Sequence, residues 1–179
     1  LAEEIVQVAL SIRPDQASLV PENRQEVTTE GGLDAIGQAE RLREVTAALQ
    51  DAGVVVSAFI DPDPAQVAAA RQAGCDAVEI HTGRYANAWL LHGSDGRGEQ
   101  VHAALDEIAA ALSAGQEAEL IVHGGHGLTY DNIQQVAAMP GFEEFNIGHS
   151  IVARAVFVGL REATAEMRYR IESAGGDEA

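Results

Sequence analysis

Histidine and glycine stand together in two short segments of the chain, at 123–127 and at 146–149. The first reads His-Gly-Gly-His-Gly, and the second reads Asn-Ile-Gly-His and leads into a predicted helix. Backbone N–H groups of a glycine turn and of a helix N-terminus can bind an anion without a lysine. An imidazole between glycines, as in His126, can approach a ligand and exchange a proton near neutral pH. The pattern predicts a phosphate site with acid–base chemistry; the alternative is that the glycines only permit tight turns and His126 is structural.

Glu79 interrupts an apolar run at 77–81 that is typical of a buried strand. Strand alternation places it on the face opposite Val78 and Ile80. Burial of a carboxyl raises its pKa, so Glu79 could act as an acid or base, or stabilise a cationic intermediate. The commoner alternative is an exposed or ion-paired strand residue.

No metal or organic cofactor is predicted. Three histidines suffice for a catalytic zinc, but no HExxH helix is present and Cys75 is the single cysteine. All 11 basic residues are arginines, which excludes Schiff-base aldolases, lysine-bound pyridoxal phosphate and the lysine-containing P-loop. Four of the six histidines follow or end predicted strands: His81, His123, His126 and His149.

The charge balance restricts the kinds of partner that the protein can bind. With 28 acidic residues against 11 basic ones, the formal net charge is −17, a field that repels nucleic acid and anionic lipid. No apolar run reaches the roughly 18 residues of a membrane span, and the first residues do not show the basic and apolar regions of a signal peptide. We therefore expect a cytoplasmic protein with small-molecule partners.

Helices and strands alternate along the 179 residues, which predicts parallel βαβ units in a single domain over 1–179. Five strands are expected, near positions 19, 57, 79, 121 and 145. Helices are expected at 1–12, 35–51, 64–73, 99–114, 132–139 and 150–173, with a less regular stretch at 84–98 that contains a mobile loop.

Two parallel architectures fit this order: a doubly wound open sheet and a (β/α)8 TIM barrel. Polar and glycine residues follow every strand, which favours the barrel, although the chain is about 70 residues shorter than a typical one. In such barrels the loops after strands seven and eight often bind phosphate. The last two predicted strands would then place Gly127, Gly148 and His149 around a phosphate group.

Four segments together strongly resemble the pyridoxine 5′-phosphate synthase family. They read LVPENRQEVTTEGGLD at 19–34, EIHTG at 79–83, GHGLTY at 125–130 and NIGH at 146–149. Their order and spacing match the C-terminal three quarters of the family's barrel, roughly strands 4–8. The resemblance implies an α/β (β/α)8 TIM barrel with about five βα units present in this chain.

The resemblance also implies an activity. The family condenses 1-deoxy-D-xylulose 5-phosphate with 3-amino-2-oxopropyl phosphate to pyridoxine 5′-phosphate, phosphate and water, without a metal or organic cofactor. His126 matches the family's catalytic acid and Glu79 its transition-state-stabilising glutamate. Thr28, Gly127, Gly148 and His149 match substrate contacts, the last three mainly around phosphate. The family forms a homo-octamer with closing active-site loops.

The sequence departs from the family in two respects. The first three βα units, with an acid–base pair and the arginines for the second substrate, are not found, so the chain is expected to be an incomplete barrel. His123 and Gly124 stand where the family has Asn and another small residue. Two alternatives therefore stay open: a truncated, non-catalytic barrel fragment, or another phosphate-sugar isomerase or lyase of the same barrel class.

Overall fold

Five parallel strands form one sheet in the computed structural model, which describes residues 1–21, 31–93 and 98–175. The strands are β1 (Gln16–Leu19), β2 (Val55–Ile60), β3 (Ala77–His81), β4 (Ile121–Gly125) and β5 (Glu144–Asn146). Each pairs with the next along the chain, in the order β1-β2-β3-β4-β5. The prediction of five parallel strands is therefore confirmed.

The predicted (β/α)8 barrel, represented by its strands 4–8, is wrong for this structure. β1 and β5 stand at the two ends of the strand order, and in the described part of the chain neither gains a second neighbour. A barrel closes only when its two edge strands pair with each other. A closed barrel whose interior is filled by side chains has about eight strands. The barrel was predicted because polar residues follow each strand. This pattern does not distinguish the two architectures, since the carboxyl ends of all parallel strands share one edge in open sheets as well.

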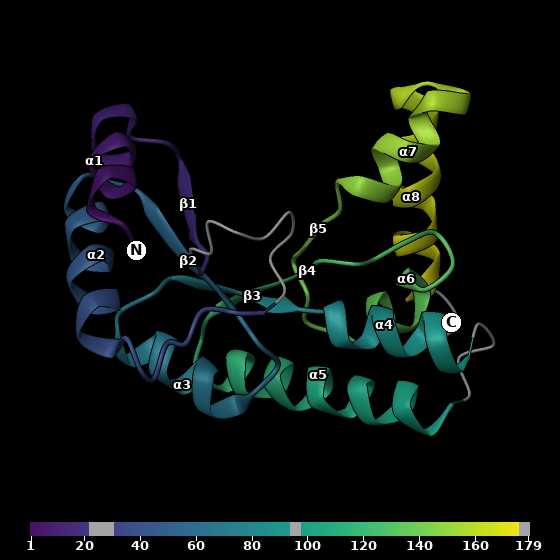
Figure 1. Cartoon of the computed structure of the whole chain (residues 1–179), viewed down its shortest axis with the longest axis horizontal. Helices are drawn as coiled ribbons and strands as arrows, with labels where there is room; N and C mark the ends of the chain where they lie inside the picture. Colours follow the sequence, from purple (N-terminus) through teal and green to yellow (C-terminus); the bar gives the residue numbers. More distant parts are fainter. Residues whose placement is uncertain (22–30, 94–97, 176–179) are drawn as a thin grey trace.

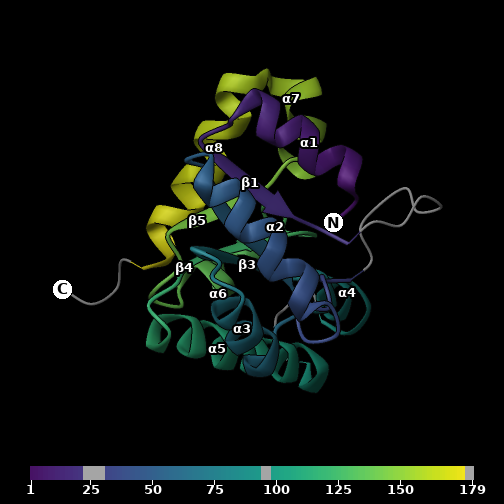
Figure 2. The same ribbon diagram turned by 90° about the vertical axis from the view of Figure 1, so that its left-hand side faces the viewer.

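The helices cover one side of this curved open sheet, as Figures 1 and 2 show. The described helices are α1 (Glu3–Ile12), α2 (Ala39–Asp51), α3 (Pro64–Gln72), α4 (Gly83–His92), α5 (Glu99–Glu117), α6 (Ile133–Ala137), α7 (His149–Val158) and α8 (Leu160–Ala174). Neighbouring helices pack in pairs, among them α2 with α3, α3 with α5, α4 with α5 and α6 with α8.

Two helices differ from the sequence prediction. The stretch at 84–98 was expected to be irregular, but α4 occupies most of it; the predicted mobile loop falls largely on residues 94–97, outside the described ranges. The last helix was expected to be continuous, but Gly159, with φ +85°, separates α7 from α8. Glycine adopts this left-handed backbone without the steric cost of a Cβ.

Aliphatic side chains make up most of the core, in a sequence with only 4% aromatic residues. β3 is buried along its whole length, and the face of α2 that carries Leu42, Val45 and Leu49 is buried against the sheet. Cys75 is fully buried as well. Tyr85 is the largest fully buried side chain among the described residues.

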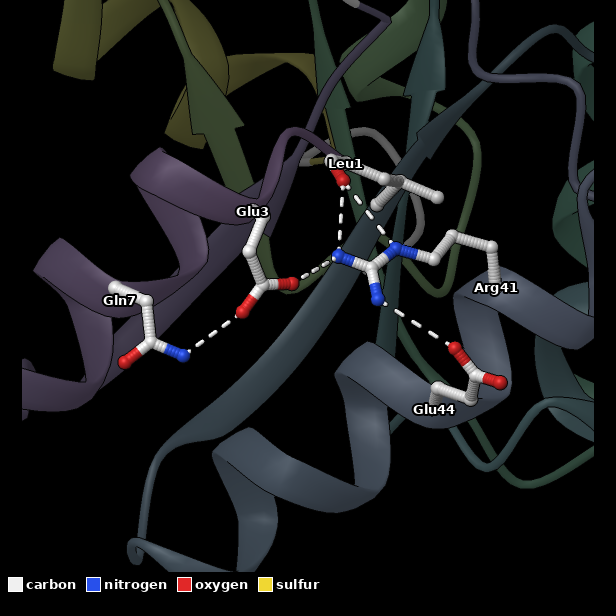
Figure 3. Close-up of polar contacts among 5 residues, drawn as sticks. All are labelled: Leu1, Glu3, Gln7, Arg41 and Glu44. Carbon is white, nitrogen blue, oxygen red and sulfur yellow. Dashed lines mark hydrogen bonds and ion pairs between the residues drawn. The ribbon is translucent and has the colours of Figure 1, made fainter.

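Polar contacts at the surface join the N-terminal helix α1 to α2. Figure 3 shows Arg41 of α2 donating to the carbonyl oxygen of Leu1 and, at 2.7 Å, to Glu3. Glu3 also accepts from Gln7 at 2.9 Å, and Arg41 reaches Glu44 at 3.4 Å. Exposed ion pairs of this kind contribute little to stability, because solvent screens them. Only Val6 of α1 is buried, so this helix adds little to the core.

None of the helices described is both long enough and apolar enough to cross a lipid bilayer.

Candidate active site

Two adjoining pockets open at the carboxyl ends of the strands, and His126 and Gly127 border both. The first, which we name the Glu79 pocket, has a volume of about 690 Å³. Five of the six residues predicted from the sequence line it: Glu79, His126, Gly127, Gly148 and His149. The second, which we name the Asp61 pocket, has a volume of about 1040 Å³ and is also lined by His81 and Gly83. Thr28, the sixth predicted residue, lies outside the described residues.

Glu79 projects from the middle of β3 and is 9% exposed. The side-chain nitrogen of Asn146 on β5 donates to its Oε2 at 3.0 Å. Burial raises the pKa of Glu79 to about 7; the bond from Asn146 opposes the rise, and the charge of Glu144 adds to it. A carboxyl with a pKa near the working pH is suited to give or take a proton.

His126 follows β4 with φ +79°, in the left-handed region that few residues other than glycine adopt. The buried hydroxyl of Thr82 shares its proton between the carbonyl oxygens of His126, at 2.6 Å, and Gly125, at 2.7 Å. The backbone N–H of Thr82 also donates to the Gly125 oxygen at 2.8 Å. These bonds hold the unusual turn in place. Burial, and next the charge of a protonated His81, lower the pKa of His126, which favours the neutral imidazole.

Steric crowding requires a glycine at position 125. It lies between His81 and Asn146 in the strand register, and a Cβ at this position would overlap Oε1 of Glu79. The residue after His126, Gly127, has φ +74°. The alternative that these glycines only permit tight turns therefore does not describe Gly125, whose missing side chain makes room for the carboxyl group of Glu79.

The N-terminus of α7 forms another wall of the Glu79 pocket. Gly148 precedes the helix and His149 begins it. Ser150 donates to the carbonyl oxygen of Leu128 at 2.9 Å, which fastens this end of α7 to the loop after His126. The first N–H groups of a helix have no partner within the helix and can bind an anion. The Gly127 loop and the start of α7 thus meet at one wall, as a phosphate site needs.

His123 lies next to Glu79 in the strand register and is 4% exposed. Its Nδ1 has no hydrogen-bond partner in the part of the chain that the structure describes. Over the same residues, no three side chains of His, Cys, Asp or Glu converge as metal ligands do.

Asp61, Thr82 and Asn146 have no role predicted from the sequence, although all three surround the predicted site residues. Asp61 directly follows β2 and Thr82 directly follows β3, so their strand-end positions were the available signal. Asn146 was named only as part of its segment, because its contact with Glu79 joins residues 67 positions apart.

Comparisons with known proteins identify the family of this chain. The family model described as pyridoxal phosphate biosynthesis protein PdxJ matches residues 1–173. A pyridoxine 5′-phosphate synthase of Synechococcus sp. (strain JA-2-3B'a(2-13)) is 54% identical over 166 residues, covering 93% of this chain and 66% of the relative. That of Azoarcus sp. (strain BH72) is 49% identical over 175 residues, covering 97% and 70%.

A solved structure is similar in fold. The crystal structure of the Amycolatopsis orientalis BexX/CysO complex contains a chain that matches with a TM-score of 0.60 at 18% identity, covering 97% of this chain and 60% of that one. Such low identity concerns the fold alone. This chain spans about two thirds of the length of the curated relatives it matches. The predicted resemblance is confirmed over nearly the whole chain, which belongs to the PdxJ family of pyridoxine 5′-phosphate synthases.

Proposed function

We propose that the protein acts in vitamin B6 biosynthesis as a pyridoxine 5′-phosphate synthase. In this proposal it condenses 1-deoxy-D-xylulose 5-phosphate with 3-amino-2-oxopropyl phosphate to pyridoxine 5′-phosphate, phosphate and water. One observation carries the proposal: a buried carboxyl, an imidazole and an anion-binding wall border the same pocket, in a member of this family.

The chemistry needs proton transfers and phosphate binding, and the pocket offers both. The amine of one substrate attacks the ketone of the other, the imine loses phosphate and water, and an aldol-type closure completes the ring. His126 is proposed as the acid: because its pKa is lowered, a proton that the imidazole takes up at one step is readily given at a later one. Glu79 is proposed to stabilise the cationic intermediates as a carboxylate. These transfers require no metal or organic cofactor.

The proposed substrate contacts follow the same wall. Gly127, Gly148 and His149 are proposed to bind the phosphate group through backbone N–H groups and the start of α7. Local dipoles can do this in spite of the net charge of −17. Thr28, outside the described residues, is proposed as a further substrate contact.

The test is a His126→Asn variant of the intact protein. Asparagine tolerates the left-handed backbone of residue 126, so the fold should survive. We expect turnover of the two substrates to fall by roughly 100-fold or more, while calorimetry still detects binding of a phosphate ester. The control is His102→Asn on the exposed side of α5. Near-normal turnover by His126→Asn would remove the assigned role.

The proposal includes a cytoplasmic homo-oligomer whose partners are small phosphorylated substrates, with no nucleic-acid or membrane partner. The acidic charge supports the absence of polyanion binding. Exposed apolar side chains on α7, Val156 at 79% and Phe157 at 85%, support an interface between copies. Sedimentation equilibrium of the intact protein tests this, and a monomer at micromolar concentration would contradict it.

A further inference from the structure

We propose that Asp61 and His81 form a positioning pair, which holds the imidazole of His126 in the orientation that proton transfer needs. The inference rests on the proposed function, in which His126 is the catalytic acid. The pair joins the end of β2 to the end of β3, and through His81 it reaches the turn after β4.

The first contact fixes the ring of His81. Its Nδ1 lies 3.0 Å from Oδ1 of Asp61, and the same oxygen accepts the backbone N–H of Gly32 at 2.9 Å. A carboxylate can only accept, so Nδ1 of His81 carries the proton. In the neutral ring Nε2 is then the nitrogen without a proton. The bond from Gly32 in turn fixes the carboxylate of Asp61.

The second contact transmits this orientation to His126. The rings of His81 and His126 meet edge to face, with centroids 4.8 Å apart and an interplanar angle of 69°. Phe59 packs beside both rings, with its centroid 5.0 Å from that of His81 and 6.3 Å from that of His126. Rings at these distances constrain one another's rotation.

Gly83 leaves the space in which the two histidine rings meet. A Cβ at this position would lie 2.5 Å from Nε2 of His81 and 3.2 Å from Cδ2 of His126. The first of these distances is shorter than a van der Waals contact, so any side chain at position 83 would push the rings apart. The glycine that begins α4 therefore belongs to the same arrangement.

Stability alone does not account for a histidine at position 81. Its side chain is 7% exposed, and Nε2 has no hydrogen-bond partner within the described ranges. A buried polar atom without a partner destabilises the folded protein, and a phenylalanine at this position would avoid that cost. The hydrogen bond to Asp61 offsets little of this cost, because Asp61 is 57% exposed. We therefore infer that histidine at position 81 serves to place a polar ring in a fixed orientation beside His126.

Nitrogen-15 NMR of the intact protein without substrate tests the proposal, because it reports which ring nitrogen of each histidine carries the proton. We expect His81 to carry its proton on Nδ1, and its ring protons to give a nuclear Overhauser contact with those of His126. Other charged or titratable groups line the two pockets and could affect the His126 signals: Glu79, Asp63, Arg84, Glu107 and His149.

The variants separate geometry from charge. Asp61→Ala should abolish the single tautomer of His81 and shift the His126 ring signals. Asp61→Asn should restore both, because its amide oxygen can accept the same two bonds. The control Asp63→Asn removes an equal charge two residues away and keeps the cap of α3, where Asp63 accepts from Ala65. It should leave the imidazole signals of His81 and His126 in place.

Kinetics supply the second readout. Asp61→Ala should lower kcat about tenfold to 100-fold while KM changes by less than about threefold, since orientation and not binding is lost. In a His81→Phe background, Asp61→Ala should add nothing, because Asp61 acts through His81.

Three outcomes would overturn the proposal: a proton on Nε2 of His81, unchanged His126 signals in Asp61→Ala, or independent effects of the two substitutions. An inactive wild-type protein would defeat the proposed function instead. The NMR result would still decide whether Asp61 and His81 hold His126.

Discussion

The side-chain nitrogen of Asn146 on β5 lies 3.0 Å from Oε2 of Glu79 on β3, and this bond passes across the intervening strand β4. It can do so because Gly125 of β4 has no side chain at the crossing point. Residues of three strands thus position the carboxyl group of Glu79, and burial of this group raises its pKa to about 7.

Substitution of Gly125 tests this crossing. In Gly125→Ala the added Cβ overlaps Oε1 of Glu79, so the carboxyl must move away from Asn146. We expect a loss of about 1–3 kcal/mol in the free energy of unfolding, together with a marked fall in turnover. Urea unfolding and a steady-state assay measure the two effects. In the stability control, Gly148→Ala, the new Cβ meets no atom within 4 Å. Equal stability of the two variants would contradict the crowding at Gly125.

The raised pKa of Glu79 predicts a pH-dependent stability. The folded protein keeps a proton that the unfolded chain releases between pH 4.5 and about 7. The stabilisation from Glu79 is therefore complete below pH 4.5 and is lost as the pH rises through 7. Glu79→Gln keeps the shape and an acceptor for Asn146 but cannot ionise. Its stability relative to wild type should rise by on the order of 2–3 kcal/mol between about pH 4.5 and 8.

Urea unfolding of both proteins at the two pH values makes this comparison. Glu162→Gln, on the exposed face of α8, is the control for a change of surface charge. Parallel pH dependences for wild type and Glu79→Gln would mean that Glu79 is ionised in the folded protein already at low pH.

Removal of the Thr82 hydroxyl should loosen the turn at His126. Thr82→Val keeps the buried shape but leaves the carbonyl oxygen of His126 without its bond of 2.6 Å. We expect the free energy of unfolding to fall by about 1–2 kcal/mol, with slower turnover because His126 sits at φ +79°. Thr82→Ser restores the hydroxyl and should recover turnover. If Ser and Val behave alike in the assay, the hydroxyl does not hold the turn.

Substitution of Tyr85 is expected to affect stability and not substrate binding. Its buried hydroxyl donates to the carbonyl oxygen of Asn132 at 2.6 Å, and burial raises its pKa so that the proton stays on the phenol. Tyr85→Phe should lower the free energy of unfolding by about 1–2 kcal/mol with little change in KM. Tyr169→Phe, at a residue 71% exposed, should stay within about 0.5 kcal/mol of wild type in thermal or urea unfolding. A large change in KM for Tyr85→Phe would instead assign Tyr85 to recognition.

Several features followed from the sequence because they depend on local signals. Apolar runs such as 77–81, ended by glycine or proline, predicted the five strands, and the helices between them predicted parallel pairing. Strand-end positions also predicted that Glu79, His126, Gly127, Gly148 and His149 would gather, since the carboxyl ends of parallel strands share one edge. The four motif segments were enough to predict the family.

Other features were decided only by the tertiary structure. Polar residues after every strand occur in open and closed sheets alike, so strand ends could not establish that the sheet stays open from β1 to β5. The partners Asp61–His81 and Glu79–Asn146 lie 20 and 67 residues apart in the chain. Their contacts depend on strand register, on the space at Gly83 and Gly125, and on the depth of burial. The sequence could therefore determine which residues reach the site, while the packing around them set their distances, their hydrogen bonds and the pKa of Glu79.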